Sequence, residues 1–175
     1  ETICKGCFSL RAIETLYNMS PDEARLFSKI ADIVIDEQYI FYKMGSVGEE
    51  INKKYGFDAP ALRLLEEVGV VNALIAEAED VIEPDECAGF QCGQYLLLVK
   101  SESSTALHYK MLLLTKVGEE LYLAFHEGKD NYAYLYDLGK TMEKELNVKV
   151  GLYRITGYSD ADIVQYDETV NLMDE

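Results

Sequence analysis

Hydrophobic positions in the first third of the chain recur at helical spacing. Apolar residues three or four positions apart predict a short first helix before residue 19: Leu10, Ile13, Leu16 and Tyr17. Ser20-Pro21-Asp22-Glu23 then combines a capping serine, a proline at the first helical position and a glutamate that can reach back to the serine amide. An apolar stripe follows at Ala24, Phe27, Ile30, Ala31 and Val34. It predicts a second helix from Pro21 to about Ile35.

The next segments predict one short strand and two helices. Tyr39–Tyr42 is β-prone and predicts an edge strand or an extended link. Residues 46–55 predict a helix, because Ser46 and Glu49 have capping-box spacing. Residues 59–68 predict another helix, capped by Asp58 and stopped by Gly69. Helix, tight glycine turn, helix and then strands is the general order of a winged helix.

The second half predicts strands, then helices, then strands. Residues 76–94 are polar and rich in acids, glycine and proline, and they predict a loop. Residues 95–99 form an apolar run of strand length, and residues 107–114 are its expected antiparallel partner. Together they would make the β-hairpin, or wing, of a winged helix. Helices are predicted over 116–125 and from Asp130 onward, and strands over 148–156 and 161–166.

These elements predict an α+β fold. N-terminal helices lead into a winged-helix-like core with a β-hairpin, within residues 1–128. A C-terminal helix-strand extension, residues 129–175, is expected to pack on the same core. A hydrophobic content of 49% is ample for that core, and no apolar run approaches the roughly 20 residues that span a bilayer. We therefore expect a cytoplasmic protein without a membrane segment. The start at Glu1-Thr2-Ile3-Cys4 indicates a piece of a longer protein.

The charge of the chain argues against nucleic-acid binding. Acidic residues outnumber basic ones 32 to 16, the net charge is −16, and no lysine or arginine occurs between Leu64 and Val99. Affinity for nucleic acids depends mainly on lysine and arginine contacts to phosphates. A winged-helix regulator would need its few bases on one face. The residues that would have to meet there are Lys53, Lys54 and Arg63 with Lys100 or Lys110 in the wing.

Two blocks of the sequence resemble a bacterial family of uncharacterised domains. The first runs from Ser9-Leu10-Arg11-Ala12-Ile13-Glu14 into Met19-Ser20-Pro21-Asp22-Glu23-Ala24-Arg25-Leu26-Phe27, and the second is Leu114-Thr115-Lys116-Val117-Gly118-Glu119-Glu120-Leu121. In that family a longer helical segment normally precedes the first block. The resemblance implies no known activity and no catalytic residue. Some relatives look like accessory pieces of phage-defence proteins, which is an association and not a mechanism. The second block is also similar to the one that follows the wing in many winged-helix regulators.

The cysteines and histidines give only weak indications of chemistry. Cys4 and Cys7 have the spacing of a zinc knuckle, and Cys87 and Cys92 could complete a tetrahedral site. Position 7 is often an ordinary small residue in the resembled family, and a thioredoxin-like setting for redox chemistry is absent. Reduced thiols without metal are therefore the expected state. His108, in a predicted strand, and His126, near a helix end, lack the spacing of metal ligands or of a nucleophile's partner.

The remaining function classes lead to one preferred interpretation. No phosphate-binding glycine motif occurs, and no cofactor or catalytic residue is indicated. The 13 tyrosines suit half-buried sheet positions or, as an alternative, a docking surface. We expect a non-enzymatic interaction or regulatory domain with a protein partner or self-association. The alternatives are a winged-helix nucleic-acid-binding regulator and an enzyme of unrecognised type.

Overall fold

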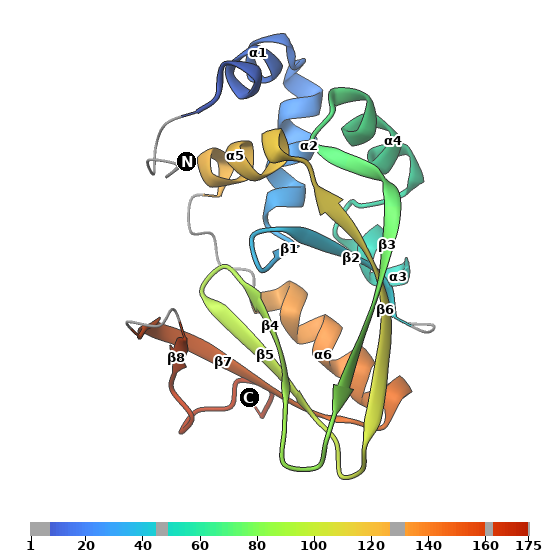
Figure 1. The fold of residues 1–175 in the computed structure, drawn as a ribbon, viewed down its shortest axis with the longest axis vertical. Helices are drawn as coiled ribbons and strands as arrows, with labels where there is room; N and C mark the ends of the chain where they lie inside the picture. The colour runs from blue at the N-terminus through green and yellow to red at the C-terminus, as the bar shows by residue number, and fades with distance from the viewer. Residues whose placement is uncertain (1–7, 45–48, 127–131, 160–162, 175) are drawn as a thin grey trace.

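The computed structural model describes residues 8–44, 49–126, 132–159 and 163–174 (Figure 1). This part of the chain has a mixed α+β fold with six helices and two four-stranded antiparallel sheets. The helices are α1 (Leu10–Asn18), α2 (Pro21–Ala31), α3 (Glu49–Lys54), α4 (Ala59–Val68), α5 (Lys116–Phe125) and α6 (Tyr132–Leu146). The strands are β1 (Val34–Ile35), β2 (Tyr39–Met44), β3 (Val71–Ile82), β4 (Ala88–Cys92), β5 (Tyr95–Lys100), β6 (Thr105–Leu114), β7 (Lys149–Tyr158) and β8 (Val164–Tyr166).

Local capping determines where the predicted helices begin. At the start of α2, the Ser20 hydroxyl accepts from the Glu23 amide at 3.3 Å, and the Glu23 carboxylate accepts from the Ser20 amide at 2.6 Å. Asp58 caps α4, and Gly69 ends it with a φ of 84°, a left-handed conformation that glycine adopts without strain. These predictions are confirmed. The predicted capping box at Ser46 lies outside the described residues.

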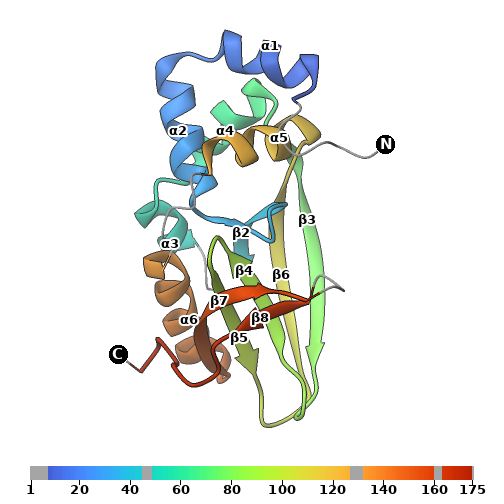
Figure 2. The same ribbon diagram turned by 90° about the vertical axis from the view of Figure 1, so that its left-hand side faces the viewer.

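The first sheet, sheet A, has the strand order β1-β2-β6-β3. Strands β3 and β6 form a long ribbon paired from Val71↔Leu114 to Ile82↔Thr105. The side of β6 that is buried changes along this ribbon. Leu107 and Tyr109 are buried at one end, whereas Leu112 and Leu114, which point to the other side, are buried at the opposite end. Figure 2 shows why, since α1, α2, α4 and α5 gather at one end of sheet A and the second sheet lies at the other.

The second sheet, sheet B, has the strand order β4-β5-β7-β8. The predicted hairpin between residues 95–99 and 107–114 is therefore wrong. Strand β5 pairs with β4 and β7, and β6 pairs with β2 and β3. The predicted loop over residues 76–94 is also wrong, because β3 continues to Ile82 and β4 begins at Ala88. Within β3, Glu77 and Glu79 are exposed, whereas Ala76 and Ala78 on the other side of the strand are half-buried and Ile82 is buried.

The prediction that α2 reaches Ile35 is wrong as well. The helix ends at Ala31, and Val34–Ile35 form β1, which pairs with the start of β2. The turn between them has positive φ at Asp36 (51°) and Glu37 (59°), and the Gln38 amide donates to the Ile35 carbonyl at 3.0 Å. Two consecutive left-handed residues characterise a tight type I′ hairpin turn. Helical spacing alone could not reveal that turn, because neither residue is glycine.

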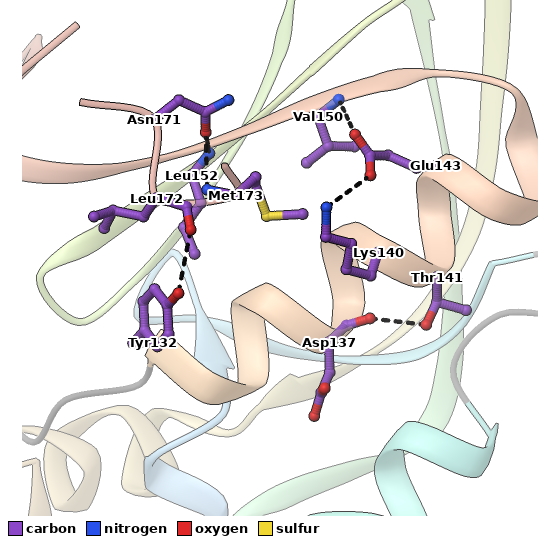
Figure 3. Close-up of polar contacts among 10 residues, drawn as sticks. All are labelled: Tyr132, Asp137, Lys140, Thr141, Glu143, Val150, Leu152, Asn171, Leu172 and Met173. Atoms are coloured by element: carbon purple, nitrogen blue, oxygen red, sulfur yellow. Dashed lines mark hydrogen bonds and ion pairs between the residues drawn. The ribbon is translucent and has the colours of Figure 1, made fainter. Parts of the chain in front are cut away.

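Hydrogen bonds join helix α6, strand β7 and the residues after β8 (Figure 3). Helix α6 packs on β5 and β7, with Leu135, Leu138 and Met142 buried. Leu172, near the end of the described chain, is held by two hydrogen bonds. Its amide donates to the Leu152 carbonyl at 2.8 Å, and its carbonyl accepts from the Tyr132 hydroxyl at 3.2 Å. Within the described ranges, none of the helices has the length and apolar character needed to cross a bilayer.

Candidate functional site

The apolar side of helix α1 faces solvent. Ser9 caps the helix by accepting from the Ala12 amide at 3.1 Å, and Ala12 is the only residue of α1 that is buried. The apolar stripe that predicted the helix is largely exposed, with 71% of Leu10, 53% of Ile13 and 87% of Tyr17 accessible to solvent. A surface helix normally turns its apolar stripe toward the core. We call Leu10, Ile13, Leu16 and Tyr17 the α1 stripe, and Phe8 adds a further exposed ring beside it.

Helix α5 lies between helix α1 and an acidic hollow. On one side α5 packs on α1, where the Glu120 carboxylate accepts from the Ser9 amide at 2.7 Å. On its other side a hollow of about 210 Å³ lies between α5 and the β1–β2 turn. Its lining combines acidic, aromatic and exposed apolar side chains: Asp36, Glu37, Gln38, Glu119, Tyr122 and Leu123. An apolar helix face and an acidic hollow thus flank the same helix.

Two carboxylates, one of them in the lining of this hollow, are bonded to buried tyrosines. The Tyr39 hydroxyl donates to Asp36 at 3.0 Å, and the Tyr109 hydroxyl donates to Asp80 at 2.9 Å. Asp36 also accepts from the Gln91 amide of β4 at 3.0 Å, which connects the β1–β2 turn to sheet B. Burial raises the pKa of Asp36 most, its two hydrogen bonds lower it, and repulsion from Asp80 raises it further. The turn therefore holds a carboxylate whose ionised form is disfavoured.

We expect Asp36→Asn to raise the stability of the fold at pH 7. The raised pKa of Asp36 means that its charged form costs free energy in the folded state, and this cost is fully present above the folded-state pKa. The cost disappears as the pH falls through that pKa toward the unfolded value. Asparagine also tolerates the positive φ at this position. Urea unfolding of both proteins should give the variant the higher free energy of unfolding at pH 7, and the difference should be smaller at pH 4. A variant less stable than wild type at pH 7 would show that the hydrogen bonds to the carboxylate outweigh its burial.

The bases proposed for nucleic-acid binding do not form a free positive face. Lys54 pairs with Asp137 of α6 at 2.6 Å, and Lys110 pairs with Glu77 of β3 at 2.6 Å. Lys53 and Arg63 are exposed on α3 and α4, and Lys100 is exposed at the end of β5 in the other sheet. Helix α4 itself carries Glu66 and Glu67 beside Arg63. Lys100 therefore belongs to a different sheet from Lys110 and does not share a wing with it.

The cysteines are only partly covered by the structure. Cys4 and Cys7 lie outside the described residues. Cys87 is exposed, whereas Cys92 is buried with its Sγ 3.5 Å from the Asp32 carbonyl. Across the described ranges no group of three or more histidine, cysteine or acidic side chains could hold a metal ion.

The histidines occupy ordinary positions. His108 lies on β6, exposed, with Nδ1 3.0 Å from the Glu79 carboxylate. His126 ends α5 and stacks on the Tyr122 ring at 4.8 Å. These positions agree with the sequence prediction of one strand histidine and one at a helix end.

Eight of the nine tyrosines from Tyr95 to Tyr166 are buried or half-buried, and one is exposed. Tyr95, Tyr109, Tyr122 and Tyr134 are buried, Tyr132, Tyr136, Tyr153 and Tyr166 are half-buried, and Tyr158 is exposed. The residues of the α1 stripe were visible in the sequence as a helical pattern, but the pattern could not show that they face outward. Asp36 and Asp80 gave no sequence signal, because the Gln91 amide and the Tyr109 hydroxyl that they bond are 55 and 29 residues away in the chain.

Comparisons with known proteins add no relative from which a role could be transferred. A scan against protein-family models, a search of curated proteins and a search of solved structures each found no match. The resemblance of the Ser9–Phe27 and Leu114–Leu121 blocks to a bacterial family therefore stays a prediction.

Proposed function

We propose that this chain is a protein-interaction domain with a winged-helix-like core, and that the α1 stripe is its docking surface. The order α2, β2, α3, α4, β3, β6 and the pairing β2-β6-β3 support the winged-helix-like description. In this arrangement β3 and β6 are the arms of the wing, and β4 and β5 are inserted between them. The single observation that carries the function is the exposed apolar side of α1. Fully burying each of its large side chains contributes about 1.5–3 kcal/mol.

The partner that fits this surface is an amphipathic helix with a basic polar side. Its apolar side would lie on the α1 stripe, and its lysines or arginines would reach the acidic hollow across α5, which Glu37 and Glu119 line. A net charge of −16 attracts such a partner and opposes a second copy of this chain. Nucleic acid is disfavoured for the same reason. The same charge predicts that the association weakens with salt.

Two synthetic peptides with the same apolar side provide the test. One carries lysines on its polar side and the other glutamates, and their binding is measured by fluorescence anisotropy at low and high salt. We expect the basic peptide to bind at least about tenfold more tightly than the acidic one, a difference of about 1.4 kcal/mol. The double variant Ile13→Ser/Tyr17→Ser should lose that binding, whereas Ile163→Ser, which removes an exposed apolar side chain elsewhere, should not.

Four outcomes would count against the proposal. Equal binding of the two peptides, or unchanged binding by the double variant, would exclude the α1 stripe as a docking surface for a basic helix. Sedimentation velocity should show a monomer, and a dimer abolished by Ile13→Ser/Tyr17→Ser would assign the stripe to a second copy instead. Retention on heparin at moderate salt would favour the nucleic-acid alternative.

A further inference from the structure

A hollow of about 500 Å³ opens on the exposed side of sheet A, below its helical end. It lies where His108 and Lys110 of β6 are exposed, before the same side of the strand becomes buried at Leu112. Its lining combines basic, acidic, aromatic and apolar side chains, among them Tyr42, Lys43, Ile75, Glu77, His108 and Lys110. A cavity of this size with a few converging polar groups is typical of small-molecule sites.

A β-bulge in β2 shapes one wall of this hollow. Phe41 pairs with Met111 and Lys43 pairs with Lys110, so Tyr42 is an extra residue without a partner on β6. The buried side chain of Asn52 fixes the bulge, because its Nδ2 donates to the Phe41 carbonyl at 2.8 Å and to the Tyr42 carbonyl at 3.1 Å. Bulges redirect side chains and are common beside functional sites. Here the bulge places Lys43 directly opposite Lys110.

That placement puts two positive charges side by side in an acidic protein. Like charges directly opposite each other on neighbouring strands are destabilising. Glu77 neutralises Lys110 from the other neighbouring strand, and Glu79 pairs with His108. None of the acidic side chains that the structure describes, which leaves out that of Glu49, forms an ion pair with Lys43. The lining of the hollow thus holds two ammonium groups, Lys43 and Lys110, against one carboxylate, Glu77, which is an excess of one positive charge with His108 neutral.

We propose that this hollow binds a small organic anion, with a carboxylate or phosphate group held between Lys43 and Lys110. The side chains of Tyr42 and Ile75 would contact an apolar or aromatic body, since both line the same hollow. Glu77 competes with the ligand for Lys110, because the Glu77 carboxylate already forms an ion pair with the Lys110 ammonium group at 2.6 Å. The site is separate from the α1 stripe and does not depend on the function proposed for it.

Titration with four probes, followed by NMR chemical shifts, tests this assignment. Phenyl phosphate and benzoate carry an anionic group on a ring, phenol lacks the charge, and inorganic phosphate lacks the ring. We expect the two ring anions to shift resonances of Lys43 and Lys110, and phenol and inorganic phosphate to bind at least about tenfold more weakly. Whichever of phenyl phosphate and benzoate binds more tightly identifies the anionic group that the site prefers.

Substitutions of exposed side chains give the proposal its sharpest test. Lys43→Gln and Lys110→Gln should each weaken binding of phenyl phosphate by about tenfold, and Glu77→Gln should tighten it because Lys110 is released. The matched control is the exposed pair of Lys149 on β7 and Glu102 after β5, at 2.7 Å, whose variants Lys149→Gln and Glu102→Gln should bind as wild type does. Equal binding of phenol and phenyl phosphate, wild-type affinity in Lys43→Gln, or no gain in Glu77→Gln would overturn the assignment.

Discussion

Replacing Gly118 by alanine is expected to lower the free energy of unfolding by at least about 3 kcal/mol, the upper end of what overpacking usually costs. Gly118 lies in the first turn of α5, where a Cβ atom would overlap the carbonyl oxygen of Val70. The same oxygen accepts from the Thr115 amide at 3.0 Å, so it cannot move without breaking that bond. Backbone has to shift on one side or the other. Urea unfolding followed by circular dichroism measures the loss.

Gly157→Ala provides the control for this prediction. A Cβ atom there would meet only the Gln165 side chain, at 3.7 Å, and we expect a change of no more than about 0.5 kcal/mol. If Gly118→Ala unfolded at the same urea concentration as wild type, α5 could move away from the α4–β3 corner at little cost. The close approach of Gly118 to Val70 would then be unimportant for stability.

Phe41→Ala is expected to cost about 3–5 kcal/mol, as is usual for truncating a buried aromatic residue. Phe41 is 1% exposed and lies between the two sheets. Its ring centroid is 5.1 Å from that of Tyr109 in sheet A and 5.2 Å from that of Phe90 in sheet B. The substitution leaves a cavity where the sheets meet, so near-ultraviolet circular dichroism from the tyrosines should weaken together with the loss of stability.

Phe8→Ala removes the same ring from an exposed position and serves as the comparison. Its expected effect on stability is about 0.5 kcal/mol or less. Similar costs for the two variants would mean that Phe41 does not hold the sheets together more strongly than a surface residue does. A large cost at Phe8 alone would contradict its exposed placement.

Local signals predicted the helices well because each signal is contained in a few neighbouring residues. The Ser20–Glu23 capping box, the Asp58 cap and the Gly69 stop all act within one turn, and each is present in the structure. The block Leu114–Leu121 is a further case. The Thr115 hydroxyl accepts from the Gly118 amide at 3.0 Å, donates to the Gly69 carbonyl at 2.6 Å and so joins α5 to the end of α4. The second bond depends on Gly69, which is 46 residues away in the chain.

Strand pairing was predicted poorly because it joins residues that are far apart in the chain. Tyr95–Val99 and Leu107–Leu114 are both strands, but nothing in their composition shows that they belong to different sheets. Acidic residues on β3 suggested a loop, because alternation between acids and alanines lacks the large apolar residues that normally mark a strand. The two sites escaped prediction for the same reason. The α1 stripe is a candidate docking surface only because it is exposed, and the hollow at Lys43 depends on a bulge fixed by Asn52.

The insertion of β4 and β5 between β3 and β6 has a consequence for the order in which the chain can fold during synthesis. Every strand of sheet A exists once residue 114 has been made, whereas β5 finds its second partner only when β7 is complete at residue 158. Domains made N-terminal end first expose unpaired strand edges and apolar surface until their partners emerge. During synthesis, the apolar strand Tyr95–Lys100 therefore has one unpaired edge until β7 has been made. In this interval the nascent chain is most exposed to aggregation, and its dense negative charge between residues 64 and 99 keeps neighbouring chains apart.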